Sequence, residues 1–332
     1  MSNIKDVAKL AGVSVPTVYK VFNPSYYTSS KVRKKVLDAV RELNYTHKAV
    51  QKKETQTAKK VIAIFIDEIL NPFYEAMILQ IVKEMERHDY VPMVMYTFNN
   101  ARIERQNFEL AIAHQCDGIM FVPAPNGDRR YVEHLIAKRY PLVQLFRSVY
   151  KELDTIMIDD ELGTYLAAQH LIQSGHKRIM MISKTNPAIY IQREMGFTQA
   201  FKDAKLPVED DWIYITNYVD CAKEMIKEKI CRHQPTAILS TGENISINVL
   251  QALAEMKLSI PGDISLVIYD NVPWAQIYGI TTVAHPYERI GQLIVELLHH
   301  QFESILQESS DSPSRLVLDP TLEARNSVKI IT

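Results

Sequence analysis

The sequence lacks the features that mark secreted and membrane proteins. Its three cysteines, Cys116, Cys221 and Cys231, have no spacing typical of a metal site or a disulfide framework. It contains no run of about 18 apolar residues that could cross a membrane. Met1 leads directly into a polar segment rather than a signal peptide. These absences predict a cytoplasmic protein with reduced thiols and no membrane segment.

Recognisable catalytic motifs are also missing. Neither G-x-G-x-x-G nor G-x-x-x-x-G-K-[ST] follows a predicted strand, and there is no nucleophile elbow. No group of His, Cys, Asp and Glu has metal-ligand spacing. We therefore expect no enzymatic activity, no cofactor and no bound metal. The alternative is an enzyme on a doubly wound sheet, and the absence of these motifs argues against it.

Charge is distributed unevenly along the 332 residues. Residues 1–60 hold 13 Lys and Arg against 4 Asp and Glu, a net charge of +9, whereas the remainder holds 25 against 35, a net charge of −10. A basic head on an acidic body is typical of a phosphate-binding module joined to a domain that does not itself bind nucleic acid.

Residues 3–23 predict a helix-turn-helix. Asn3 caps a first short helix, Gly12 supplies a tight turn, and Ser14 caps a second helix. The apolar residues at helical spacing are Ile4, Val7, Ala8, Ala11, Val18, Val21 and Phe22. Any small helical domain can show this spacing, and the positive charge is what favours DNA binding. The second helix of such a motif enters the major groove.

The outward positions of the second helix carry the candidate base contacts. Val15 and Pro16 have no side-chain donor and can read only apolar edges such as thymine methyl groups, whereas Lys20 can donate to guanine. Pro16 is tolerated because it lies in the first helical turn. Tyr19 is expected to contact phosphate, with packing against the next helix as the alternative.

A third helix is predicted over residues 31–43, capped by Ser29. Its inward positions are Val32, Val36, Val40 and Leu43. Its outward positions are Lys31, Arg33, Lys34, Lys35 and Arg41. A run of charge is usually a solvated helix face, but in this small domain it favours phosphate contacts.

Residues 6–23, DVAKLAGVSVPTVYKVFN, closely resemble the head-piece signature of the LacI/GalR family of bacterial transcription regulators. The resemblance implies a DNA-binding head over residues 1–47, although the family usually has Ser-Arg at Tyr19 and Lys20, and Lys is not equivalent to Arg at a bidentate site. Combined with the outward positions, it gives as DNA-binding residues Ser14, Val15, Pro16, Thr17, Tyr19, Lys20, Asn23, Ser29, Arg33 and Val50.

The family has a hinge helix after the head, and this chain departs from its pattern over residues 48–60. Glu54 stands where the family has the leucine that wedges into the minor groove, and His47 replaces a proline. A carboxylate cannot enter stacked bases without a large desolvation cost. We therefore expect a smaller operator bend than in the family, or wedging by Val50 alone.

From residue 61 onward, short apolar strands alternate with amphipathic helices, which predicts two α/β lobes with parallel sheets and a ligand cleft between them. The expected strands are residues 61–66, 91–96, 118–122, 141–146, 178–183, 212–216, 237–240 and 265–269. Segments such as NPFY, GHKRI, IPGDIS and YDN extend the family resemblance through this body.

The resemblance implies a body of the type I periplasmic-binding-protein kind over residues 61–332. In the family the chain crosses three times between lobes. This places lobe one at about 61–157 and 288–315, and lobe two at about 158–287 and 316–332.

The resemblance also places effector-binding residues in the cleft. Arg193 and Asp270 occupy positions that bind polar groups of effectors, and Phe73 and Tyr74 lie where apolar residues line the first lobe. Phe146 stands with Val122, Gly242 and Glu243 where sugar-binding relatives often have polar residues. This exchange favours an anionic or partly apolar effector, with a sugar derivative or a protein co-regulator as alternatives. Tyr218 and Trp274 could line the walls, but core packing is favoured for both, as a structural role is for His176.

These expectations together predict a transcription regulator, most simply a repressor, in which a small molecule in the cleft changes how two heads bind a pseudo-palindromic operator. A homodimer is implied because one helix-turn-helix makes few base contacts. Residues 326–332 lack apolar heptads, which argues against a coiled-coil tetramer. A two-lobe receptor of the periplasmic type is the remaining alternative, and the basic head argues against it.

Overall fold

The computed structural model describes residues 4–22, 28, 30–43, 59–68, 71–184, 187–216, 222–307 and 312–332. It divides into two compact units, Met1–Lys59 and Lys60–Thr332. The predictions for the hinge, including Glu54, lie outside the described residues. The same holds for Asn3, Asn23, Ser29, Val50, Tyr218 and Cys221, and for the side chains of Phe22, Lys20 and Glu243.

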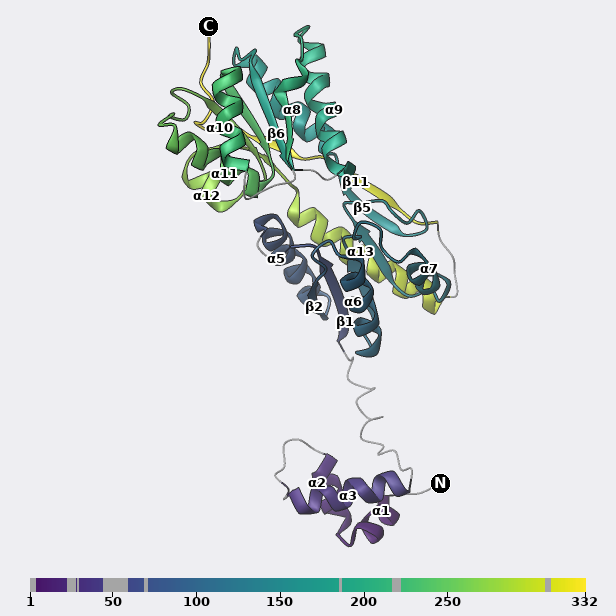
Figure 1. Ribbon diagram of the computed structural model, residues 1–332. Coiled ribbons are helices and arrows are strands. Elements are labelled where there is room, and N and C mark those ends of the chain that lie inside the picture. The colour runs from purple at the N-terminus through teal and green to yellow at the C-terminus, as the bar shows by residue number, and fades with distance from the viewer. Residues whose placement is uncertain are drawn as a thin grey trace. The chain divides into compact units, whose positions relative to one another are not determined.

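The described residues of the first unit form three helices around a small apolar core (Figure 1). They are α1 (Ile4–Ala11), α2 (Val15–Phe22) and α3 (Ser30–Glu42). Val7, Val18 and Val36, one from each helix, are completely buried. Gly12 joins the first two helices at φ +64°, a left-handed conformation that costs glycine little. The helices and the turn predicted from the apolar spacing are confirmed.

Lobe one of the second unit is built on a six-stranded parallel sheet with strand order β11-β5-β4-β3-β1-β2. Its strands are β1 (Lys60–Ile66), β2 (Tyr90–Tyr96), β3 (Gly118–Phe121), β4 (Leu142–Leu145), β5 (Asp154–Ile158) and β11 (Arg315–Leu318). Its helices are α5 (Pro72–Arg87), α6 (Ala101–Ala113), α7 (Arg129–Ala137) and α13 (Tyr287–Leu306).

Alternate residues of β1 face opposite sides of this sheet, as a fully covered parallel strand requires. Ile62 and Ile64 pack with α5 and α13, whereas Ala63 and Phe65 pack with α6 and α7. All four side chains are buried. The continuous apolar run of β1 therefore reflects helices on both faces.

Lobe two repeats the plan with strand order β12-β10-β9-β8-β6-β7, in which only the β10–β12 pair is antiparallel among the pairings described. Its strands are β6 (Ile179–Lys184), β7 (Ile213–Thr216), β8 (Ala237–Thr241), β9 (Ser265–Tyr269), β10 (Thr281–Ala284) and β12 (Thr321–Glu323). Its helices are α8 (Asp160–Gln173), α9 (Pro187–Asp203), α10 (Ala222–His233), α11 (Glu243–Glu255) and α12 (Pro273–Ile277), with a short 3₁₀ turn at Asp210–Trp212. The predicted class of two parallel-sheet lobes is confirmed (Figure 1).

The chain passes between the lobes three times: after β5, between β10 and α13, and after β11. The last passage lies a few residues later than expected. Residues 316–318 belong to lobe one rather than lobe two, because Leu316, Val317 and Leu318 pair with β5 in parallel. The sequence pattern had missed β5, β10, β11 and β12.

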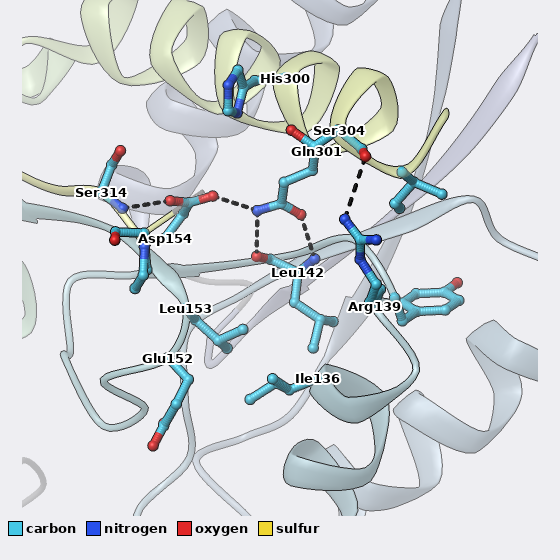
Figure 2. A pocket seen from close by; sticks show the side chains of 14 residues that line it. Ile136, Arg139, Leu142, Glu152, Leu153, Asp154, His300, Gln301, Ser304 and Ser314 are labelled. Atoms are coloured by element: carbon cyan, nitrogen blue, oxygen red, sulfur yellow. Dashed lines mark hydrogen bonds between the residues drawn. The ribbon is translucent and has the colours of Figure 1, made fainter. Parts of the chain in front are cut away.

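A polar network fastens the C-terminal part of α13 to the first residues of β4 and β5 in the lobe-one sheet. Figure 2 shows the Gln301 side chain reaching from α13 to the backbone N–H and carbonyl of Leu142 and to Asp154. Asp154 also accepts from the backbone N–H of Ser314, and Arg139 donates to the carbonyl of Ser304. Polar groups that line the small pocket at this point hydrogen-bond one another. This favours a structural role for these groups over ligand binding.

Candidate functional site

The head presents its predicted DNA-binding residues at the start of α2. The carbonyl of Ser14 accepts from the backbone N–H groups of Thr17 and Val18, as expected at an N-cap. The hydroxyls of Ser14 and Thr17 lie 2.8 Å apart. Pro16 is exposed in the first turn, where its missing N–H costs nothing.

Tyr19 is 51% exposed, which leaves about half of its surface available for a phosphate contact, while packing of the remainder on α3 stays the alternative. Arg33, Lys34 and Lys35 are exposed on α3, as the apolar spacing predicted. The head therefore combines an exposed tyrosine on its second helix with exposed cations on its third.

A pocket of about 320 Å³ lies between the two lobes of the second unit. It has a size typical of small-molecule sites. The structure brings all five predicted effector-binding residues into its lining: Phe73, Tyr74, Phe146, Arg193 and Asp270. Val122 and Gly242 line it as well. Glu68 of lobe one accepts from the Nδ2 of Asn244 at 3.4 Å, which joins the lobes beside the pocket.

Aromatic rings form one wall of the pocket. The ring of Phe73 lies edge-on to Tyr74 and to Phe146, with centroids 5.1 Å from each. Asn71 caps α5 and accepts from the backbone N–H of Phe73 at 3.0 Å. This cap fixes the start of the helix and so helps to position the Phe73 side chain. Burial, followed by the nearby Asp67 carboxylate, raises the pKa of Tyr74 well above its ordinary value. Tyr74 therefore stays a neutral phenol.

A buried arginine that the sequence reasoning missed lies on the lobe-one side. Nη1 of Arg147 donates to the Oδ1 of Asn99 at 2.7 Å and to the carbonyl of Pro123 at 2.6 Å. Its Nη2 lies 3.1 Å from Oδ2 of Asp67, which also accepts from the Nδ2 of Asn99. Asp67 follows β1 and Arg147 follows β4, so two strand ends carry this ion pair.

A second arginine–aspartate pair lies on the lobe-two side. Nε and Nη2 of Arg193 both approach Oδ1 of Asp160, at 2.8 and 2.7 Å, and Nη1 donates to the carbonyl of Thr241. The guanidinium lies 3.9 Å from the ring centroid of Tyr269. These contacts hold the planar group in one orientation at the pocket wall.

Asp270, in contrast, does not pair with Arg193. Its Oδ1 accepts from Nε2 of His285 at 2.8 Å, and the ring of His285 lies edge-on to Phe73. Among the described residues, Nδ1 of His285 and Nε of Arg147 are buried without a hydrogen-bond partner. Such atoms are rare in folded proteins, and both belong to side chains that line this pocket.

Among the described residues that line the pocket, three other than glycine have left-handed backbones: Asn99 at φ +52°, Phe146 at φ +60° and Asp270 at φ +76°. For phenylalanine this conformation is strained, and such strain is concentrated at functional sites. The strand ends are thus bent so that side chains enter the pocket rather than continue the sheet.

Two tempting residues are structural. His176 is completely buried, with Nδ1 3.0 Å from the hydroxyl of Thr236 and Nε2 3.1 Å from the carbonyl of Lys329, and burial lowers its pKa. It fastens the C-terminal segment to lobe two, as a structural role implies. Trp274 packs against the α10–α11 side of lobe two and is not among the residues lining the pocket.

Within the described residues, no group of three or more His, Cys, Asp and Glu could hold a metal ion. None of the helices in the same residues is long and apolar enough to cross a membrane.

A helix-turn-helix head followed by two parallel-sheet lobes with a pocket between them defines a ligand-responsive DNA-binding protein. Comparison with protein families agrees. Residues 3–48 match the bacterial regulatory proteins of the lacI family, and residues 168–328 match a periplasmic binding protein-like domain. Residues 3–48 thus form a DNA-binding domain of the lacI type, and the chain is a DNA-binding transcription regulator.

Relatives extend over nearly the whole chain. The HTH-type transcriptional repressor PurR of Actinobacillus pleuropneumoniae serotype 3 is 29% identical over 99% of both chains. The ribose operon repressor of Haemophilus influenzae is also 29% identical over 99% of both chains. Among solved structures, the lac repressor dimer bound to operator and the anti-inducer ONPF is 21% identical, with a TM-score of 0.68 over 99% of both chains.

Proposed function

We propose that this regulator is a cytoplasmic repressor without enzymatic activity, which acts as a homodimer on a pseudo-palindromic operator and responds to a small molecule in the pocket between its lobes. In this proposal residues 1–47 form the DNA-binding head, residues 48–60 the hinge, and residues 61–332 the effector-binding and dimerisation body. The repressor relatives and the lac repressor dimer on its operator support this assignment.

For DNA binding, we assign base contacts to Val15, Pro16 and Lys20. We assign contacts with the DNA phosphate backbone to the remaining head residues. The exposure of Tyr19 and Arg33 supports this division. The backbone contacts are assigned to Ser14, Thr17, Tyr19, Asn23, Ser29 and Arg33, and a minor-groove contact is assigned to Val50.

The charges of the pocket favour an uncharged effector. Arg147 and Arg193 are already paired with Asp67 and Asp160, and Asp270 is paired with His285. An anion would have to compete with these carboxylates for each arginine, at a large desolvation cost. The pairing thus argues against the anionic class that the retained Arg193 had favoured.

The observation from which we infer the class of ligand is the combination of paired charges with an aromatic wall in one pocket. Each carboxylate–cation pair offers both acceptors and donors, which suit the hydroxyl groups of a sugar, and a sugar ring can pack against Phe73 and Phe146. The ribose operon repressor relative makes D-ribose the first compound to test. A neutral planar heterocycle is the alternative that fits the same rings.

The test begins with selection of bound sites from random DNA by the full chain at two salt concentrations. We expect an inverted repeat whose affinity falls steeply with salt. Operator binding is then measured with D-ribose and with ribose 5-phosphate, which differ by the charged group. A response to ribose alone supports a neutral sugar effector.

A response to ribose 5-phosphate alone would overturn the neutral class. No response to either sugar, together with restored regulation by an added protein fraction, would favour control by a protein partner. Failure to enrich any repeat would contradict the operator-binding proposal itself.

A further inference from the structure

One buried carboxylic acid lies behind the pocket rather than in its lining. Glu104 is on α6, and its side chain is almost completely buried, with a residue exposure of 1%. Its Oε2 accepts from the backbone N–H of Ala124 at 2.5 Å. Ala124 belongs to the loop that follows β3 and leads to α7. A carboxyl group therefore holds this loop from inside lobe one.

The loop is shaped around this carboxyl group at a second point. A Cβ atom added to Gly127 would lie 2.5 Å from Oε1 of Glu104 and 3.3 Å from the hydroxyl of Tyr150. The first distance is shorter than real Cβ contacts allow, so the backbone of Gly127 approaches the carboxyl as only glycine can. The segment 124–127 thus contacts the Glu104 carboxyl group at both of its ends, through the Ala124 N–H and the Gly127 backbone.

The opposite side of the same loop forms part of the pocket. Pro125 lines the pocket directly. The carbonyl of Pro123 accepts from Nη1 of Arg147 at 2.6 Å, and Arg147 is the lobe-one arginine that pairs with Asp67. A displacement of the loop would therefore move both Pro125 and a hydrogen-bond partner of Arg147.

We propose that Glu104 is a positioning residue that fixes residues 123–127, and through them Arg147 and Pro125, and that its protonation makes the ligand pocket respond to pH. This inference rests on the proposed function for its effect on ligand binding. Its effect on the loop is independent of any ligand.

Burial raises the pKa of Glu104 from 4.5 to about 7, while the N–H of Ala124 and the charge of Arg147 oppose this rise. The other titratable group facing it is Tyr150, whose pKa is raised to about 12 by burial and then by Glu104. Tyr150 is thus neutral near pH 7. Glu104 is the group of this cluster that changes charge close to neutrality.

The folded protein binds this proton more tightly than the unfolded chain does. The contribution of Glu104 to stability is therefore fully present below pH 4.5 and is lost as the pH rises through about 7. The folding equilibrium constant should fall on the order of 100-fold across this window because of this one group.

The first experiment measures denaturant unfolding of the full chain from pH 4.5 to pH 8.5 for the wild type, E104Q and E109Q. E104Q replaces the carboxylic acid with a neutral side chain of the same shape, and Glu109 is exposed on the same helix. We expect E104Q to lose the fall in unfolding free energy that the wild type shows as the pH rises through about 7, and to be more stable than the wild type at pH 8.5. E109Q should keep the wild-type profile.

Hydrogen exchange of the Ala124 amide at one fixed pH tests the positioning role. Exchange should be at least about tenfold faster in E104A than in the wild type, because the acceptor is removed, and close to wild type in E104Q. Identical exchange in E104A and the wild type, or an unchanged stability profile in E104Q, would overturn the inference.

The second arm measures the pH dependence of D-ribose binding. A neutral ligand that displaces polarisable water near Arg147 should disfavour the ionised form of the nearby Glu104 and raise its pKa more, so affinity should decline as the pH rises through 7 in the wild type but not in E104Q. Ribose binding with the same pH profile in both proteins would contradict the link to the pocket. If ribose does not bind at all, the proposed effector fails, while unfolding and exchange still decide the role of Glu104.

Discussion

Nε2 of His285 donates to Oδ1 of Asp270 at 2.8 Å, and this pair joins the two lobes at the pocket. Asp270 follows β9 of lobe two, whereas the ring of His285 lies edge-on to Phe73 of lobe one, with centroids 5.0 Å apart. His285 itself belongs to the segment through which the chain passes from β10 to α13. A ligand in the pocket can therefore affect the segment that connects β10 to α13, because a single hydrogen bond links Asp270 to His285 in that segment.

A double-mutant cycle on D270N and H285A should give a coupling energy of at least about 1 kcal/mol, because both groups are buried, D270N removes the charge of the acceptor, and H285A leaves the Asp270 carboxylate without its donor. Asparagine suits the left-handed backbone at position 270, so D270N tests the charge rather than the backbone. Denaturant unfolding measures the cycle. The exposed pair Arg129–Glu133 is the control, with an expected coupling below about 0.5 kcal/mol. Equal coupling in the two pairs would contradict a buried link.

Substitution of Arg193 by Lys should abolish the ligand response while leaving ligand-free operator binding unchanged. Lysine cannot bind Asp160 through two nitrogen atoms while donating to Thr241 and stacking on Tyr269. Operator titrations with and without D-ribose measure both quantities. R232K, on an exposed arginine of α10, should behave as the wild type. An intact response in R193K would exclude Arg193 from the ligand site.

The sequence predicted the regular parts of the fold because they are long and apolar. β1 is a buried run covered on both faces, and its pattern is unambiguous. β5 and β10 were missed because they are short and carry Thr155, Thr281 and Thr282, whose polar side chains are nevertheless buried. The three-dimensional sheet buries these hydroxyl groups, and the linear pattern does not show that.

The candidate site was predicted in part for a similar reason. Phe73 and Asp270 lie in segments with a family pattern, whereas Arg147 is defined by partners far apart in sequence, Asp67 and Asn99. The rule that ligands bind beyond the carboxyl ends of parallel strands would have indicated Asp67 after β1 and Arg147 after β4. The pairing itself depends on how the loops converge, which no local pattern records.

Replacing Tyr19 by Ala should weaken operator binding without destabilising the head. The side chain is 51% exposed on α2, so its loss should change stability by less than about 0.5 kcal/mol. Fluorescence anisotropy on the selected operator measures affinity, and thermal unfolding measures stability. Leu10 is similarly exposed on α1, and L10A should preserve operator affinity. Equal loss of affinity in the two variants would indicate a nonspecific effect on the head.

The C-terminal end of α12 exposes neighbouring apolar side chains, and we expect a second copy of the chain to bind there. Ile277 is 80% exposed and the adjacent Tyr278 is 75% exposed. Neighbouring large apolar side chains with this exposure are typical of interaction surfaces. Substitution of Ile277 by Lys should place an unpaired charge in a dimer interface there and so favour monomers.

Sedimentation of the full chain at several concentrations checks this expectation. I277K should sediment as a monomer where the wild type is a dimer, and its operator affinity should fall because two linked heads bind a repeat far more tightly than one. L306K is the matched control, since Leu306 is equally exposed at the end of α13. A dimer in I277K together with a monomer in L306K would assign the interface to α13 instead, because only the substitution inside an interface disrupts it.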